Sequence, residues 1–467
     1  MEKSICKQNV SMRKLLEAIN EEPAGIAFVV DDDGKLSGVV TDGDFRRMLL
    51  AGKSLDESLQ HSDLGAFVFA KEGQTMEEMM KITDKRVRTV PIVNAEGKPV
   101  NYFRYEHRLS MIPVAEPDLR GNEFKYLSDA FLSTWISSRG KYIDQLEADF
   151  SKFVGCSHGV AVSNGTVAIH LALLALKIGP GDEVIIPDLT FAATINTVLH
   201  AGATPVIVDI DPVSWCIDPA AIEKAITPKT KAIIPVHVYG QPCDMDPIMA
   251  IAKKNNLFVV EDCAEAHGAL YKGKPVGSFG EISCYSFFAN KIITTGEGGM
   301  CVTNDAHLND RMRVLRDHGM NKSKRYWHDE VGYNYRMTNL QASIGVAQLE
   351  RVEQIIADRK TVEKKYKEAL AAFPFVRWQA DVPERSRVVW LVCLELIGAD
   401  REKLFLALNK HGVDVRPFFY PLSDMDVYKK YVHSSGVSKS VSDRGLNLPT
   451  INEINYDKVV AAFKEIS

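Results

Sequence analysis

The fold is decided by the stretch HGVAVSNGTVAIHLALLAL (158–176), which is followed by DEVIIP (182–187), FAATINTVLHAG (191–202) and TPVIVDID (204–211). Short runs rich in Val and Ile alternate here with longer segments of helical periodicity, a pattern typical of βαβ units. Successive βαβ units build a mostly parallel sheet with helices on both faces. The sequence therefore predicts an α/β fold with functional residues in the loops that follow the strands.

The size and composition of the chain fit a globular protein of two or three domains. The 467 residues are too many for one ordinary core. Hydrophobic residues make up 46%, charged residues 25%, and the formal net charge is −5, so nucleic acid is not an expected partner. Apolar runs such as VIIP (184–187) and AIIPV (232–236) are far shorter than the roughly 20 residues of a membrane span. No contact with a membrane is predicted.

The N-terminus and the cysteines indicate where the protein works. The first residues lack the apolar core and small-residue cleavage site of a secretory signal. The 8 cysteines are scattered, without a CxxC pair or histidines at zinc-like spacing. We therefore expect a cytoplasmic protein with reduced cysteines and no metal.

A weak internal repeat precedes the βαβ region. Its copies are FVVDDDGKLSGVVTDGDF (28–45) and VPIVNAEGKPVNYFRYEH (90–107), and a helical segment precedes each, at 11–22 and 75–85. Each copy is predicted to form a strand, a turn that ends in Gly-Lys and a second strand. The segment HRLSMIPVAEPD (107–118), with two prolines and no periodicity, is predicted to join this module to the next domain.

The repeat resembles a tandem pair of CBS domains. In that family a threonine and an aspartate three residues later hold the ribose of an adenine nucleotide, and Thr41 and Asp44 match this pattern. The second copy has Arg104 and His107 at the corresponding positions. The resemblance thus implies one nucleotide site at most, the alternative being a docking module in which Asp44 is only a helix N-cap.

Beyond the repeat, an isolated lysine and the start of a predicted helix are candidate functional features. Lys291 lies in CYSFFANKIITTGEGGM (284–300), between a strand-like run and a Gly-rich turn, where a lysine is usually solvated surface. In AVSNGTVAIHLAL (161–173) a strand ends and a helix begins with Gly165 and Thr166. Free N–H groups at a helix start, beside a hydroxyl and an unobstructed glycine, suit a phosphate. A plain N-cap turn is the alternative.

Two further strand ends carry candidate residues. NLFVVEDCAEAHG (256–268) delivers Asp262, and a buried acid needs a cationic partner such as a protonated pyridine nitrogen, unless it caps the next helix. PDLTFAATINTV (187–198) brings Phe191, whose ring can stack on a cofactor or pack in the core. Because the GxGxxG and P-loop patterns are missing, hydride transfer and ATP hydrolysis are disfavoured.

In this order, the segments resemble the DegT/DnrJ/EryC1/StrS family of sugar aminotransferases, a branch of the fold-type I enzymes that use pyridoxal 5′-phosphate (PLP). The resemblance covers residues 112–467 and includes GNEFKYLSDAFLSTWISSRG (121–140) and GYNYRMTNLQASIGVAQLE (332–350). It implies three domains: a tandem CBS-like module (1–110), a large PLP-binding domain (111–360) and a small C-terminal α/β domain (361–467).

The resemblance also implies a role for each candidate residue. Lys291 would bind PLP covalently and then move a proton between the substrate carbon and C4′ of the cofactor. Asp262 would pair with the ring nitrogen, Phe191 would stack on the ring, and Glu265, where many members have Gln, would lie beside the ring hydroxyl. The phosphate would be held by Gly165, Thr166, Ser286 and, from the neighbouring subunit of a homodimer or larger assembly, Asn334.

The reaction implied is transamination, because relatives that act as dehydratases replace the lysine with histidine. L-Glutamate would load the cofactor as pyridoxamine 5′-phosphate, leaving 2-oxoglutarate, and a 4-keto-6-deoxy nucleotide sugar would accept the amino group. The segment at 317–341 resembles members that act on GDP-4-keto-6-deoxy-mannose, with UDP-linked sugars as the alternative. Candidate nucleotide contacts, which equally suit interface packing, are Arg325, Tyr326, Trp327 and His328.

Two other classes of function compete with this one. The chain could be a catalytically silent PLP-fold regulator whose active part is the CBS-like module, but an idle site has no use for both Lys291 and Asp262. A nucleotide-binding enzyme without PLP is disfavoured because the glycine fingerprint is missing.

Overall fold

The chain forms two compact units, Met1–Leu109 and Ser110–Ser467. The computed structural model describes residues 4–21, 25–74, 82, 87, 89–104, 111–321 and 323–466. Almost all of the helical segment predicted at 75–85, and His107, lie outside these residues. Within the described ranges, no helix combines the length and the apolar character that a bilayer crossing requires.

The first unit contains the same small sheet twice, as the sequence repeat predicts. In each copy a parallel strand pair continues into an antiparallel hairpin. The copies comprise β1 (Ile5–Lys7), β2 (Ile26–Val30) and β3 (Leu36–Thr41), and β4 (Ala70–Lys71), β5 (Thr89–Val93) and β6 (Pro99–Arg104). Helices α1 (Met12–Glu21) and α2 (Asp42–Leu50) pack on the first copy, and the short helix η2 (His61–Asp63) follows.

The two hairpin turns of this unit are built alike. Asp31 and Asn94 each accept backbone N–H groups from the residues two and four positions further along. Gly34 and Gly97 have φ angles of 79° and 80°, in the left-handed region that favours glycine. The N–H of Leu36 donates to the carbonyl oxygen of Gly97 at 3.0 Å, so the two turns contact each other.

A seven-stranded sheet forms the centre of the second unit, and only β15 runs against its neighbours. The predicted α/β fold with a mostly parallel sheet is therefore confirmed. The central strands are buried along most of their length, as expected for strands covered on both faces. In spatial order they are β7 (His158–Val162), β15 (Gly299–Thr303), β14 (Ile282–Ser286), β11 (Phe258–Asp262), β10 (Thr230–Ile233), β8 (Glu183–Pro187) and β9 (Thr204–Val208).

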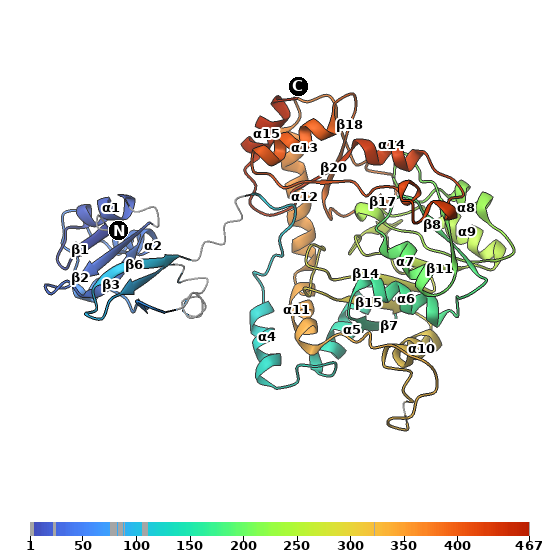
Figure 1. Ribbon diagram of the computed structural model, residues 1–467, viewed down its shortest axis with the longest axis horizontal. Coiled ribbons are helices and arrows are strands. Elements are labelled where there is room, and N and C mark those ends of the chain that lie inside the picture. Colours follow the sequence, from blue (N-terminus) through green and yellow to red (C-terminus); the bar gives the residue numbers. More distant parts are fainter. Residues whose placement is uncertain are drawn as a thin grey trace. The chain divides into compact units, whose positions relative to one another are not determined.

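Helices cover this sheet in layers (Figure 1). Helix α6 packs on β14 and β15 and on α7 and α10, and its residues are almost all apolar because little of it reaches solvent. Helix α5 packs on β7, α11 on α5, and α4 on α11, while α8 and α9 contact β9 and β11. The bounds are α4 (Glu123–Leu132), α5 (Lys141–Val154), α6 (Gly165–Ala175), α7 (Ala193–His200), α8 (Pro219–Ala225), α9 (Met245–Asn255), α10 (Ala306–Arg316) and α11 (Asn339–Leu349).

The long helix α12 (Val352–Ala369), orange in Figure 1, leads from α11 toward the C-terminal elements α13 and α15. These surround a four-stranded sheet of the order β16-β18-β20-β19. A three-stranded sheet of the order β13-β12-β17 connects the segment that follows β11 with the C-terminal segment. The bounds are β12 (Leu270–Tyr271), β13 (Lys274–Pro275), β16 (Val376–Trp378), β17 (Arg385–Ser386), β18 (Val392–Leu396), α13 (Arg401–Lys410), β19 (Arg416–Pro417), α14 (Val437–Arg444), β20 (Gly445–Leu448) and α15 (Tyr456–Lys464).

The C-terminal segment contributes to two hydrophobic cores. One core lies between its own sheet and helices α12, α13 and α15. Trp390, Phe418, Leu422 and Val441, however, pack into the core of the large sheet. Packing therefore crosses the domain boundary expected after residue 360, and that boundary stays a prediction.

Candidate active site

A cavity of about 670 Å³ lies where β7, β8, β11 and β14 end. These four strands run in the same direction, so their carboxyl ends meet at one edge of the sheet, where α/β proteins bind ligands. The residues predicted for the cofactor within one chain all line this cavity: Gly165, Thr166, Phe191, Asp262, Glu265, Ser286 and Lys291.

The N-terminus of α6 closes one end of the cavity. The side chain of Asn164 caps the helix by accepting the N–H of Val167 at 2.9 Å, which leaves the N–H groups of Gly165 and Thr166 for an anion. A side chain at position 165 would place its Cβ 2.7 Å from the Cβ of Ser286. Only glycine therefore fits beside Ser286. The capped turn is present, and the anion site at Gly165 and Thr166 stays a prediction.

Asp262 is the last residue of β11 and its carboxylate is buried. It accepts a hydrogen bond from the hydroxyl of Thr194 at 3.0 Å and one from the N–H of Ala264 at 3.1 Å. Burial raises the pKa of Asp262 despite these bonds, so a cation in the cavity would be a favourable partner. The alternative that Asp262 caps a following helix is wrong, because turns follow the strand.

Lys291 and Glu265 form a buried pair. The Nζ atom of Lys291 lies 3.7 Å from Oε1 of Glu265, and Oε2 of Glu265 accepts the N–H of Tyr239 at 2.7 Å. Burial raises the pKa of Glu265 to about 7 and lowers that of Lys291, while their mutual attraction opposes both shifts. A lysine with a lowered pKa supplies the neutral amine that acts as nucleophile and base.

Aromatic rings form the wall nearest to Lys291. The Nζ atom of Lys291 lies 4.1 Å from the centroid of the Trp390 ring. Trp390 stacks on Tyr239, and Tyr239 stacks on Phe419. Phe191, 61% exposed at the cavity, lies 5.9 Å from Phe419 between ring centroids. Trp390 and Phe419 line the cavity but were not predicted, because nothing in their local sequence distinguishes them from core residues.

The remaining predicted residues lie outside this cavity within the described chain. Arg325, Tyr326, Trp327 and His328 belong to the segment after α10, in which Tyr326 is 73% and Trp327 53% exposed. Asn334 forms a strand bridge with Asp317 and accepts hydrogen bonds from the guanidinium of Arg336.

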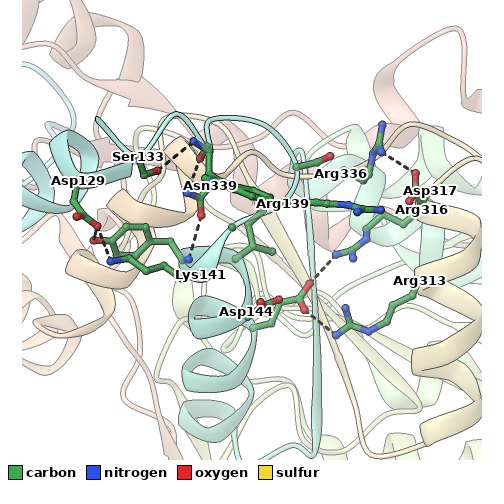
Figure 2. Close-up of a pocket in the computed structure, with 16 residues that line it drawn as sticks. Asp129, Ser133, Arg139, Lys141, Asp144, Arg313, Arg316, Asp317, Arg336 and Asn339 are labelled. Atoms are coloured by element: carbon green, nitrogen blue, oxygen red, sulfur yellow. Dashed lines mark hydrogen bonds and ion pairs between the residues drawn. The ribbon is translucent and has the colours of Figure 1, made fainter. Parts of the chain in front are cut away.

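A second cavity, of about 770 Å³, lies between α5, α10 and the segment before α11 (Figure 2). Its charged groups pair largely with one another. Glu147 binds Arg313 at 2.8 Å and Arg316 at 2.7 Å, and Arg336 binds Asp317 at 2.8 Å. Its larger size therefore does not mark it as the site of the chemistry.

A buried network supports the strand end that carries Asp262. Nδ1 of His237 accepts the N–H of Cys243 at 3.0 Å, so Nε2 carries the proton and donates to Glu261 at 3.1 Å. Glu261 also accepts the N–H groups of three loop residues, Gly277, Phe279 and Gly280. Together with Cys263, these side chains lie close enough to hold a metal ion, but the carboxylate already has its hydrogen bonds.

The cavity residues fit PLP. The helix start and Ser286 suit a phosphate, the buried Asp262 suits a protonated ring nitrogen, and the amine of Lys291, whose side chain is 12% exposed at the cavity, suits covalent attachment. A mostly parallel sheet with these groups at its strand ends defines a PLP-dependent aminotransferase. Residues 117–466 match the DegT/DnrJ/EryC1/StrS aminotransferase family, and the chain belongs to this family.

Individual relatives cover the same part of the chain. GDP-perosamine synthase of Caulobacter vibrioides is 46% identical over 366 residues, which are 77% of this chain and 99% of the relative. GDP-perosamine synthase of Escherichia coli O157:H7 is 44% identical over 77% of this chain and 98% of the relative. An aminotransferase structure from Psychrobacter cryohalolentis has 34% identity and a TM-score of 0.68, covering 75% of this chain and 97% of that one.

The first unit also has a family match, to the CBS domain over residues 5–51. There Thr41 caps α2 and accepts the N–H of Asp44 at 3.2 Å, while Asp44 accepts the N–H and the hydroxyl of Thr41 at 2.9 and 2.7 Å. The idea that Asp44 is the N-cap is therefore wrong, because Thr41 has the extended backbone of a cap and Asp44 lies inside the helix.

Replacing Glu265 with glutamine should change how stability depends on pH. The pKa of Glu265, about 7 in the folded protein, exceeds the roughly 4.3 of a solvated glutamate. The folded state therefore binds this proton more tightly, and the stabilisation is lost as the pH rises from about 4 to about 7. Relative to the unchanged apoprotein, Glu265→Gln should gain about 1–3 kcal/mol between about pH 5 and pH 8, measured by urea denaturation.

Glu368→Gln, which removes an exposed partner of Lys364, is the matched control and should show no such gain. A constant difference between Glu265→Gln and the unchanged protein across this range would show that Glu265 does not titrate as described.

Proposed function

We propose that the chain transfers the amino group of L-glutamate to the keto carbon of GDP-4-keto-6-deoxy-mannose, giving GDP-perosamine for a surface polysaccharide such as a lipopolysaccharide O-antigen. The observation that carries this proposal is the buried Lys291 between Glu265 and Trp390, in a cavity that also holds Asp262 and the open start of α6. The 46% identity to a GDP-perosamine synthase supports the choice of sugar. The cytoplasmic location stays a prediction.

Each cavity residue has a proposed role toward the cofactor. PLP, when bound, supplies an electron sink for the carbanion formed at the substrate carbon. Lys291 would hold it covalently, Asp262 would keep the ring nitrogen protonated, and Phe191 would cover the ring face. The phosphate would be held by Gly165, Thr166 and Ser286.

The chain's own residues then move the proton. The amine of Lys291, whose pKa burial lowers, would take a proton from the substrate carbon and would return it at C4′ of the cofactor. The pKa of Glu265 is about 7, so near neutral pH this carboxyl group can release or accept a proton beside the amine. Trp390 and Phe419 exclude water from the reacting atoms. The donor and acceptor half-reactions use the same site, so ping-pong kinetics follow.

A homodimer with shared active sites is part of the proposal. Helix α4 and the segment after it expose large apolar side chains, which in a soluble protein mark an interface. They are Phe124 (81% exposed), Phe131 (66%), Leu132 (78%), Trp135 (61%) and Ile136 (46%). An isologous contact here would bring Asn334 of one subunit to the phosphate of the other, and would offer the exposed segment 325–328 to the nucleotide.

The first experiment is the absorbance spectrum of the purified protein before and after addition of L-glutamate. A band of the lysine-bound cofactor that glutamate bleaches is expected in the unchanged protein and in Lys272→Ala, which alters an exposed lysine, but not in Lys291→Ala. The amine-loaded protein should then react with GDP-4-keto-6-deoxy-mannose at least 10-fold faster than with a UDP-linked keto sugar.

The opposite preference would transfer the proposal to a UDP-linked substrate. A colourless protein that takes up no added PLP would overturn it and favour a catalytically silent regulator.

Shared sites predict complementation between two inactive variants. Lys291→Ala removes the lysine, and Asn334→Asp would place a negative charge against the phosphate. Random pairing makes half of the dimers mixed, with one intact site of two, so co-expression should restore about a quarter of the unchanged activity. Lys291→Ala with Asp262→Ala, both of which act in the same cavity, is the control and should restore none. Equal inactivity of both mixtures would place Asn334 in its own subunit's site, whereas full activity of Asn334→Asp by itself would place Asn334 outside the machinery.

A nucleotide site at Thr41 and Asp44 is a second proposal, motivated by the CBS match. The two side chains bond to each other and Asp44 also binds Arg47, so a ribose would have to replace some of these bonds. Titration with ATP, AMP or GTP should change the transamination rate, and Asp44→Ala, unlike the exposed Asp56→Ala, should abolish the response. Kinetics that no nucleotide alters would refute the coupling, which requires unequal affinity for two states.

A further inference from the structure

Arg359, on helix α12, is a buried cation. Its Nη1 donates to the carbonyl oxygen of Trp390 at 2.6 Å and its Nη2 to that of Lys291 at 3.3 Å. Across the described ranges, no carboxylate forms an ion pair with it. Burial lowers its pKa to about 10. Burying a charge without an ion pair is unfavourable unless other contacts compensate; here the two carbonyl oxygens accept hydrogen bonds from Arg359, and Asp118 attracts it electrostatically.

The loop that carries Lys291 depends on these contacts. Between β14 and β15 the chain has no regular secondary structure around Lys291, and a loop fixes a side chain less firmly than a strand or helix does. The indole N–H of Trp390 donates to the carbonyl oxygen of Asn290 at 2.9 Å. The consecutive carbonyls of Asn290 and Lys291 are thus held by Trp390 and Arg359, and Arg359 also holds Trp390.

These three hydrogen bonds form a closed arrangement around the lysine. Trp390 is fixed at its backbone by Arg359 and at its ring by Asn290, and the same ring lies 4.1 Å from the Nζ atom of Lys291. Arg359 and Trp390 both come from the C-terminal half of the chain, whereas Lys291 comes from the large sheet. The position of the amine therefore depends on a residue that does not line the cavity.

We propose that Arg359 is a positioning residue for transamination: through the carbonyls of Lys291 and Trp390, it sets where the amine and the indole ring lie relative to each other. The proposal rests on the proposed function in taking Lys291 as the reacting lysine. That lysine must bond to the cofactor, leave it, act as a base and bond again, so a fixed backbone keeps the amine within reach at each stage.

The test compares Arg359→Lys and Arg359→Met with Arg387→Met. Arg387 is a matched control, because it is also a buried arginine of the C-terminal half but pairs with Glu363 and Asp381. Each variant is purified with PLP, and its thermal midpoint is recorded. The readouts are kcat and KM for L-glutamate, and the visible circular dichroism of the lysine-bound cofactor, whose sign and size report the orientation of the cofactor against the lysine.

Arg359→Met should lower kcat on the order of 100-fold, the effect of an approximately 1 Å displacement, with little change in KM and with altered visible circular dichroism. Arg359→Lys retains a cation and fewer directed donors, and should lie between Arg359→Met and the unchanged protein. Arg387→Met should lower the thermal midpoint but leave the circular dichroism unchanged. If Arg359→Met does not fold, Arg359→Lys decides the question.

Unchanged kcat and circular dichroism in a folded Arg359 variant would overturn the proposal, and so would equal changes in Arg387→Met, since these would indicate general loosening. An unchanged protein without any cofactor band would instead refute the proposed function, so the two failures are distinguishable.

Discussion

The placement of an amine and a carboxyl group together, away from water, is the constraint on which the rest of this structure depends. The Nζ atom of Lys291 and Oε1 of Glu265 lie 3.7 Å apart in the wall of the cavity. Burial favours the neutral form of each group, and their mutual attraction favours the charged forms. Burial has the larger effect on both groups, so the pKa of Glu265 rises to about 7, that of Lys291 falls, and the two pKa values approach each other. These pKa shifts require that water be kept away from the pair and that the groups around the pair stay fixed.

The sheet provides most of that fixation. Strands β7, β8, β11 and β14 end at one edge, and each contributes a group to the cavity from its last residues or from the loop just after it. The buried network of His237 and Glu261 ties the loop at 277–280 to the strand that bears Asp262. The C-terminal half then closes the remaining side with Trp390 and Phe419, which explains why its residues pack into the large core.

The residues that stand in recognisable short segments of the large domain could be predicted from the sequence. The residues that reach this region from the C-terminal segment could not. Gly165 stands at a helix start, Asp262 at a strand end and Lys291 in the loop after a strand, where pattern and chemistry coincide within about ten residues of chain. Trp390 and Arg359 come from the distant C-terminal half, and no spacing rule relates them to Lys291. The alternative in which Asp44 is the N-cap is wrong because Thr41 and Asp44 cap α2 together, and the sequence pattern does not show which of them has the extended backbone. Asn334 and the segment 325–328 lie outside the cavity of one chain, so their proposed roles depend on the proposed second subunit.

The contact between the two hairpin turns of the first unit has a consequence for its history. The N–H of Leu36 donates to the carbonyl oxygen of Gly97, and Gly34 and Gly97 have nearly the same φ angle. Each copy of the repeat therefore supplies part of the surface on which the other packs. A duplicated segment that becomes mutually dependent in this way can no longer lose either copy without exposing the other. The second copy has Arg104 and His107 at the positions that correspond to Thr41 and Asp44, so the two copies share this backbone contact but differ in these side chains.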